Sequence, residues 1–225
     1  MGFIYEARSS TSPYVDTIMR GWTEHNGTTI RPATAHWHMV FVRLQGHMHP
    51  VAVGPLTTSG VVPFNEGVEI LWVRFSLGAF MPHLPVRNFL DTETPLPDAS
   101  SRSFWLGGQV WQFPDYDNVE TFVDRLVRNA VLARDPLVNS VLQDHPPEVS
   151  PRTVRHRFLR ATGLTHSLIR QIERAQQAEA LLQQGASILD TVFKLGYYDQ
   201  PHLTRSLKRW IGHTPSKIAQ INQPA

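Results

Sequence analysis

Apolar residues occupy every second position in two stretches of the N-terminal half, residues 38–44 and 71–77. A period of two is typical of strands, because successive side chains point to opposite faces. Residues that favour turns separate these stretches, at positions 45–46, 54–55, 59–60 and 65–67. The pattern predicts a small antiparallel sheet or barrel. The proline-rich residues 82–103 are expected to be mostly loop.

The period changes after Asp117. From Val119 to Val131 apolar residues recur every three or four positions, and Glu120 follows Asp117 by three residues, as in a capping box. This spacing predicts an amphipathic helix over residues 118–134. Its apolar stripe could form a dimer surface, but packing on the sheet is favoured because one such stripe is normal for a core-facing helix.

From Ser150 onward the pattern predicts helices alone. Four glycines stand where helix ends favour a left-handed residue, namely Gly163, Gly185, Gly196 and Gly212. We therefore expect an α+β protein with a small, β-rich, barrel-like N-terminal domain and an all-α C-terminal domain. The expected divisions are residues 1–117, a helix and linker at 118–145, and a helical domain at 146–225.

Composition narrows the chemistry. The chain has no cysteine, which excludes disulfides, zinc fingers and a cysteine nucleophile. The first residues lack the pattern of a secretion signal, and glycine, proline and histidine interrupt the longest uncharged stretch, residues 44–65. We expect a cytoplasmic protein without a membrane partner. No catalytic motif is visible, so neither an enzyme activity nor a cofactor is expected.

The charge is divided unevenly along the chain. Residues 1–139 carry 10 arginines against 13 acidic residues, whereas residues 140–225 carry 11 basic against 6 acidic ones. The basic part is also the helical part. A basic helical domain is what binding to a polyanion such as DNA requires.

Residues 187–212 have the pattern of a helix-turn-helix. Ser187 can cap a short helix that Gly196 ends, and Asp199 can cap a second helix over residues 199–211. Pro201 falls in the first turn of that helix, where its missing N–H costs nothing. In such a motif the second helix enters the major groove of DNA.

The second helix has one apolar and one polar face. Leu203, Leu207 and Ile211 recur at intervals of four and are expected to face inward. The residues expected outward are Gln200, Thr204, Arg205 and Lys208. Arginine can pair with guanine and glutamine with adenine, whereas Lys208 and Arg209 are expected to reach phosphates.

The string from Ser187 to Ser216 resembles the second helix-turn-helix of AraC/XylS-type transcription regulators, and residues 150–165 resemble the recognition helix of the first. The helix predicted between them, residues 166–184, would span roughly 28 Å at 1.5 Å per residue. Adjacent major-groove faces lie about 34 Å apart. A helix of this length suits two reading helices about one turn of DNA apart.

The resemblance implies base contacts in both motifs, at Arg152, Arg155 and His156 and at Gln200, Pro201 and Arg205. Pro201 has no side-chain donor, and an unperturbed His156 is mostly uncharged near neutral pH. Pro146 and Pro147 interrupt the place where the family has the supporting helix of the first motif. We therefore predict a shortened first motif, with the second supplying most of the base readout.

Residues 71–96 resemble, less specifically, sensor domains that precede such DNA-binding units. The resemblance implies a β-rich domain that responds to a small-molecule effector. Candidate ligand-binding residues are Trp37, His38, Trp72 and Arg74. Expected partners are double-stranded DNA, an effector, a second copy of the chain and, for an activator, RNA polymerase.

Two His-x-His pairs support a different hypothesis. His36 with His38, and His47 with His49, can each project from one face of a strand, as metal ligands do. The protein would then be a metal-dependent, cupin-like enzyme or a metal sensor with a degenerate DNA-binding module. A third possibility is a regulator that binds DNA weakly. Ordinary pocket or surface histidines are favoured, and no metal site is predicted.

Overall fold

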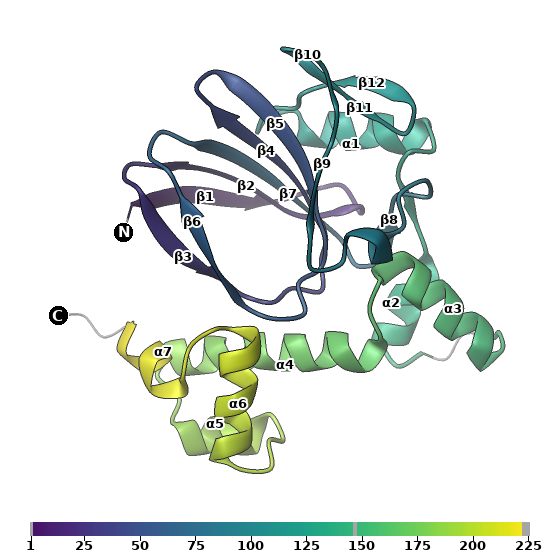
Figure 1. The fold of residues 1–225 in the computed structure, drawn as a ribbon. Helices are drawn as coiled ribbons and strands as arrows, with labels where there is room; N and C mark the ends of the chain where they lie inside the picture. The colour runs from purple at the N-terminus through teal and green to yellow at the C-terminus, as the bar shows by residue number, and fades with distance from the viewer. Residues whose placement is uncertain (1, 146–147, 222–225) are drawn as a thin grey trace. The chain divides into compact units, whose positions relative to one another are not determined.

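The computed structural model describes residues 2–145 and 148–221, and the chain forms two compact units (Figure 1). The first comprises the described residues up to Thr28, His36–Pro55 and Pro63–His166. The second comprises Thr29–Ala35, Leu56–Val62 and the described residues from Ser167 onward. A β-rich part followed by helices confirms the predicted fold class. The predicted domain limits, which were drawn from motifs and not from contacts, stay a prediction.

A six-stranded antiparallel sheet forms the first unit, in the order β1-β2-β7-β4-β5-β9 (Figure 1). Its strands are β1 (Phe3–Ser9), β2 (Val15–Thr23), β4 (His38–Leu44), β5 (His47–Val53), β7 (Glu69–Phe75) and β9 (Glu93–Pro95). The predicted turn between β4 and β5 is confirmed. Its residues Gln45 and Gly46 both have positive φ, 51° and 80°, as in a tight hairpin.

One face of the sheet carries the core. Ile18, Met39 and Val73 are fully buried on it, and the register places Met39 opposite Val73. The alternate residues of β4, Val42 and Leu44, point to the other face and are half-buried. The more deeply buried residues of β4 are therefore Met39 and Phe41. The alternating residues of 38–44 from which the strand was predicted lie on the opposite face of β4.

The helix α1 (Val119–Arg128) packs against the core face. The ring centroid of its Phe122 lies 6.1 Å from that of Phe41 on β4 and 6.2 Å from that of Phe104. Packing on the sheet, the favoured interpretation of the apolar stripe, is thus confirmed. Phe104 belongs to a three-stranded sheet of β10 (Asp98–Ser100), β11 (Ser103–Leu106) and β12 (Gln109–Gln112).

The predicted ends of this helix were wrong. It stops at Arg128 rather than at residue 134, and Ala130 adopts a positive φ of 56°. Residues Ala133–Arg134 instead form β13, which pairs with β8 (Ala79–Phe80). A strand pairing with a distant segment overrides the helical period here.

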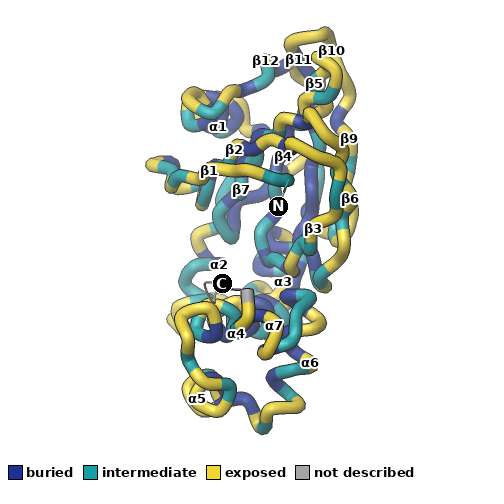
Figure 2. Tube along the Cα trace, turned by 90° about the vertical axis from the view of Figure 1, so that its left-hand side faces the viewer, coloured by how far each residue is buried: buried dark blue, intermediate teal, exposed yellow. Residues whose placement is uncertain are grey.

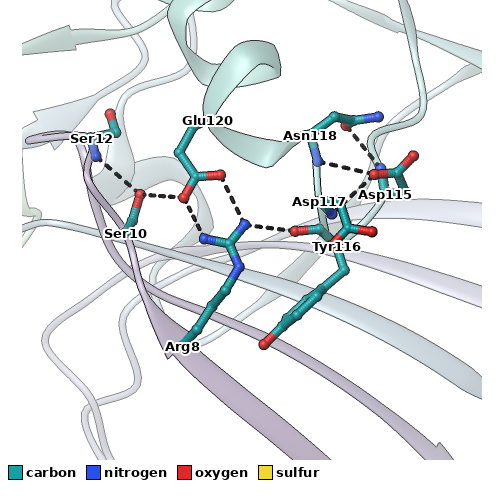
Figure 3. A network of polar contacts seen from close by, with 8 residues as sticks. All are labelled: Arg8, Ser10, Ser12, Asp115, Tyr116, Asp117, Asn118 and Glu120. Carbon is teal, nitrogen blue, oxygen red and sulfur yellow. Dashed lines mark hydrogen bonds and ion pairs between the residues drawn. The ribbon is translucent and has the colours of Figure 1, made fainter.

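The start of α1 also differs from the predicted capping box. The N-cap is Asn118, not Asp117, and its side chain accepts a hydrogen bond from the N–H of Asp115. Glu120 is held by Arg8 of β1, whose Nη2 lies 2.9 Å from Glu120 Oε2 (Figure 3). This ion pair ties the N-terminal strand to α1 and lowers the pKa of Glu120 to about 2, chiefly through the hydrogen bond from Arg8.

Residues 82–103, expected to be mostly loop, contain regular structure. A 3-10 helix, η1 (Val86–Phe89), is followed by β9 and β10. Val86 and Phe89 are fully buried. The two strands have three residues each, too few to show a period of two in the sequence.

Two helices complete the first unit, α2 (Pro136–Leu142) and α3 (Pro151–Thr162). They pack against each other, and α3 also packs against η1 and β8. Asp135 caps α2 by accepting from the N–H of Leu137, and it binds Arg157 of α3 through two hydrogen bonds of 2.9 and 2.6 Å. Burial alone would raise the pKa of Asp135, but these bonds outweigh it and lower that pKa.

The second unit holds α4 (His166–Gln183, from Ser167 onward), α5 (Ile188–Lys194), α6 (Gln200–Trp210) and α7 (Pro215–Ile221). It also contains parts of a separate two-stranded ribbon, β3 (Gly27–Arg31) and β6 (Gly60–Phe64). The glycines that follow α4, α5 and α6 all have positive φ, as predicted. No described helix is long and apolar enough to cross a membrane.

Candidate nucleic-acid interface

The predicted helix-turn-helix is present as α5, a turn at Gly196 and α6. Ser187 caps α5 by accepting from the N–H of Asp190 at 3.0 Å, and Asp199 caps α6 by accepting from the N–H of His202 at 2.6 Å. Gly196 has a φ of 65°, which a residue with a side chain rarely adopts. Both predicted caps and the predicted turn are confirmed.

Buried side chains fix the angle between the turn and α6. The hydroxyl of Tyr197 lies 3.0 Å from Ser206 Oγ on α6, and both residues are buried. On the other side, the guanidinium of Arg174 on α4 lies 4.5 Å from the centre of the Tyr197 ring. Tyr197 therefore joins α4, the turn and α6.

The two faces of α6 are as predicted. Leu203 and Leu207 are fully buried and Ile211 is 2% exposed. The opposite face presents the predicted contact residues: Gln200, Pro201, Arg205, Lys208 and Arg209 are exposed and Thr204 is half-buried. An exposed, basic helix face on a leucine-packed back has the shape and charge of a major-groove reader.

The first motif offers a smaller set of side chains. Arg152, Arg155 and His156 are exposed on the N-terminal half of α3, on one face at intervals of three and four. Two other cations of α3 contact protein groups. Arg157 binds Asp135, and the guanidinium of Arg160 lies 5.4 Å from the centre of the Phe80 ring.

The predicted shortening of the first motif is visible ahead of α3. The described residues between Leu142 and Ser150 form no helix, and α2, seven residues long, is the helix that packs against α3. Pro146 and Pro147, on which the prediction rested, lie outside the described residues.

Sequence reasoning did not select Tyr198, a further candidate contact. It is 91% exposed and stands in the turn just ahead of α6, beside the predicted readers Gln200 and Pro201. Two apolar residues of α5 are also exposed, Leu189 at 65% and Phe193 at 86%. For Leu189 and Phe193, the sequence signal that could have identified them is a large apolar side chain at a position outside the apolar spacing of α5.

The four candidate ligand-binding residues do not share a face. Trp37 belongs to the core, where its ring stacks on Phe75 at 3.9 Å and its Nε1 donates to the carbonyl of Ala79. His38 lies opposite Arg74 in the register, on the same face as Trp72. Arg74 donates to Asp16 Oδ2 at 2.7 Å. Ligand binding by these residues stays a prediction.

A cleft of about 360 Å³ lies elsewhere in the first unit. Its lining includes Arg20, Trp22, Met48 and Tyr116, and none of the four candidate ligand-binding residues. The guanidinium of Arg20 lies 4.5 Å from the centre of the Tyr116 ring.

The histidine pairs are spread over the sheet. His36 is half-buried, and its Nδ1 lies 2.7 Å from the carbonyl oxygen of Phe75; desolvation lowers the pKa of this imidazole. His49 lies opposite Val42, four residues along β4 from His38, which corresponds to about 13 Å at 3.3 Å per residue. Among residues 2–145 and 148–221, no three potential metal ligands come together.

The helices match a known family. A family model described as a helix-turn-helix domain matches residues 148–221, so this part of the chain is a helix-turn-helix domain. The matched residues include both strings that resemble AraC/XylS-type regulators.

A regulator and a solved structure are also similar to this chain. The HTH-type transcriptional regulator VirS of Mycobacterium tuberculosis, found in two strains, is 44% identical over 69 residues. That match covers 30% of this chain and only 20% of the relative. A crystal structure of ToxT from Vibrio cholerae O395 aligns with 99% of this chain and 100% of its own, at 10% identity and a TM-score of 0.38.

Proposed function

We propose that the protein is a sequence-specific, DNA-binding transcription regulator that reads the major groove mainly with α6. The observation that carries this proposal is the exposed face of α6, with Arg205 and Gln200 as base readers and Lys208 and Arg209 as phosphate contacts. The helix-turn-helix family and the regulator VirS support it. The basic charge of the helical part supports it as well.

In this proposal α3 assists α6. Arg152, Arg155 and His156 supply additional contacts from the first motif, and Thr204 supplements the second. The protein has no catalytic role, and the first unit responds to a small molecule. No observation on the described residues favours the metal-dependent alternative, since their histidines do not form a cluster.

Selection of bound fragments from genomic DNA by the full-length protein tests the proposal. We expect recovery of fragments that share one site, with an affinity that falls as salt rises while the preference for the site persists. A mixture of unrelated fragments of the same length is the control. Equal retention of all fragments, lost together at higher salt, would contradict sequence-specific binding.

A further inference from the structure

The C-terminal end of α6 is closed by residues that lie far away in the sequence. A helix leaves its last four carbonyl groups without partners inside the helix. In α6 these are the carbonyls of residues 207–210. The carbonyl of Leu207 accepts from the following N–H groups of Ile211 and Gly212, at 2.8 and 2.9 Å.

The other three carbonyls accept from the two N-terminal segments of the second unit. The N–H of Ser59 donates to the carbonyl of Arg209 at 2.8 Å, and the hydroxyl of Ser59 lies 3.2 Å from the carbonyl oxygen of Lys208. The N–H of Ala33 donates to the carbonyl of Trp210 at 2.6 Å. In contrast, α4 is closed locally, by the N–H groups of residues 184–186.

The two segments are joined to each other and to α4. Thr34 and Leu56 exchange two backbone hydrogen bonds of 3.0 and 2.9 Å. The side chain of Gln176 on α4 donates to the carbonyl of Ala33 at 3.0 Å. Residues 29–35 and 56–62 thus form one clasp between α4 and the end of α6, which we call the α6 clasp.

The packing at Gly212 is equally close. A Cβ atom at this position would lie 2.6 Å from Ile30 Cγ2 and 3.2 Å from Ser59 Oγ. The first distance is too short for any real contact, and the methyl group sits on a branched, stiff side chain. Gly212 is therefore required for the clasp as well as for its own φ of 88°.

We propose that the α6 clasp is part of the DNA-reading apparatus and sets the position in which α6 is presented to the major groove. This inference rests on the proposed function, which assigns α6 as the helix that reads the major groove. Strands β3 and β6 run from the clasp into the first unit. The ribbon is therefore a covalent route by which a change in the first unit reaches α6.

Gly212→Ala in the full-length protein tests the clasp, and Gly185→Ala is its matched control. Both glycines follow a helix with a φ of 88°, but a Cβ at Gly185 would meet nothing within 4 Å. We expect Gly212→Ala to weaken specific binding at least ten-fold more than Gly185→Ala does. Adding Ile30→Ala to Gly212→Ala removes the clashing methyl group and should restore most of the lost specific binding.

Two readouts separate positioning from simple instability. Loss of folded protein would weaken specific and nonspecific binding equally, whereas misplacement of α6 lowers the ratio between them. Ser59→Ala, a milder change, should lower the same ratio because it removes one donor to the carbonyl of Lys208. Equal effects of the two glycine variants, with no rescue by Ile30→Ala, would overturn the inference.

Thermal unfolding of the same variants distinguishes failure of the clasp from failure of the proposed function. A parent protein that binds no DNA specifically would refute the function and, with it, a role for the clasp in reading. The Tm coupling between Ile30→Ala and Gly212→Ala then still reports whether the clasp contact exists. Additive Tm changes would show that it does not.

Discussion

Arg205 and Arg152 are predicted base contacts of the two motifs, and both are exposed, Arg152 in the first turn of α3 and Arg205 in the middle of α6. Their surroundings differ. Arg205 stands on α6, whose back is buried and whose two ends are both capped. Arg152 stands on α3, whose other cations Arg157 and Arg160 contact groups of the first unit.

Arg205→Ala should therefore weaken binding to one operator more than Arg152→Ala. A good bidentate contact to a base is worth about 1 to 3 kcal/mol, or roughly 5- to 150-fold in affinity. We expect a loss in that range for Arg205→Ala, measured by titration at fixed salt. Arg102→Ala, an exposed arginine in the first unit, controls for charge; an equal or larger loss at Arg152 would refute the second motif as the main reader.

At the scale of elements, the helices could be predicted from the sequence because their signals are local. Ser150, Ser187 and Asp199 cap helices with their own side chains, and Gly163, Gly196 and Gly212 follow helices with positive φ. Each signal lies within a few residues of the helix end that it determines. The helix-turn-helix was accordingly placed with the right caps and the right buried face.

The strands missed by sequence reasoning lack such local signals. Most residues of β1 are exposed (Figure 2), so its sequence shows no alternation. In β2 the register with β7 shifts between Val15 and Thr17, which breaks the period of two. The α6 clasp could not be predicted either, because its hydrogen bonds join residues about 150 positions apart.

Asp199→Ala tests the capping of α6. Loss of an N-cap acceptor costs about 1 kcal/mol of stability, and the first turn of α6 carries the predicted readers Gln200 and Pro201. We expect a lower Tm together with weaker specific binding. Asp199→Asn keeps an acceptor oxygen and should retain most of the Tm and most of the specific binding. Similar losses for the two variants would argue against capping as the cause.

At the scale of the whole molecule, the two units are expected to respond differently to acid. In the first unit, arginine partners help lower the pKa values of Asp16, Glu120 and Asp135. A lowered folded-state pKa gives stability that is present above the ordinary pKa and lost as the pH falls below it. In the second unit, burial raises the pKa of Glu179. Protonation of Glu179 in acid therefore removes the free-energy cost of burying its charge.

The first unit should therefore unfold first as the pH falls from about 4.5 toward 2, the range over which Glu120 loses its charge in the unfolded and folded states. Tryptophan fluorescence reports mainly on this unit, which contains Trp22, Trp37, Trp72, Trp105 and Trp111. Glu120→Gln should flatten the pH dependence of its free energy of unfolding. Glu66→Gln, at an exposed turn, controls for loss of one charge; an unchanged pH profile for Glu120→Gln would contradict the prediction.

The segment that this chain shares with its relatives does not coincide with the parts that pack together. The family match begins at residue 148, yet α3 packs with Asp135 and η1, and α6 is closed by Ala33 and Ser59. A recombination event that moved residues 148–221 alone into another gene would leave these partners behind. The helix-turn-helix domain of this protein is therefore less portable than its sequence motif, and its exchange during evolution requires compensating changes in the recipient chain.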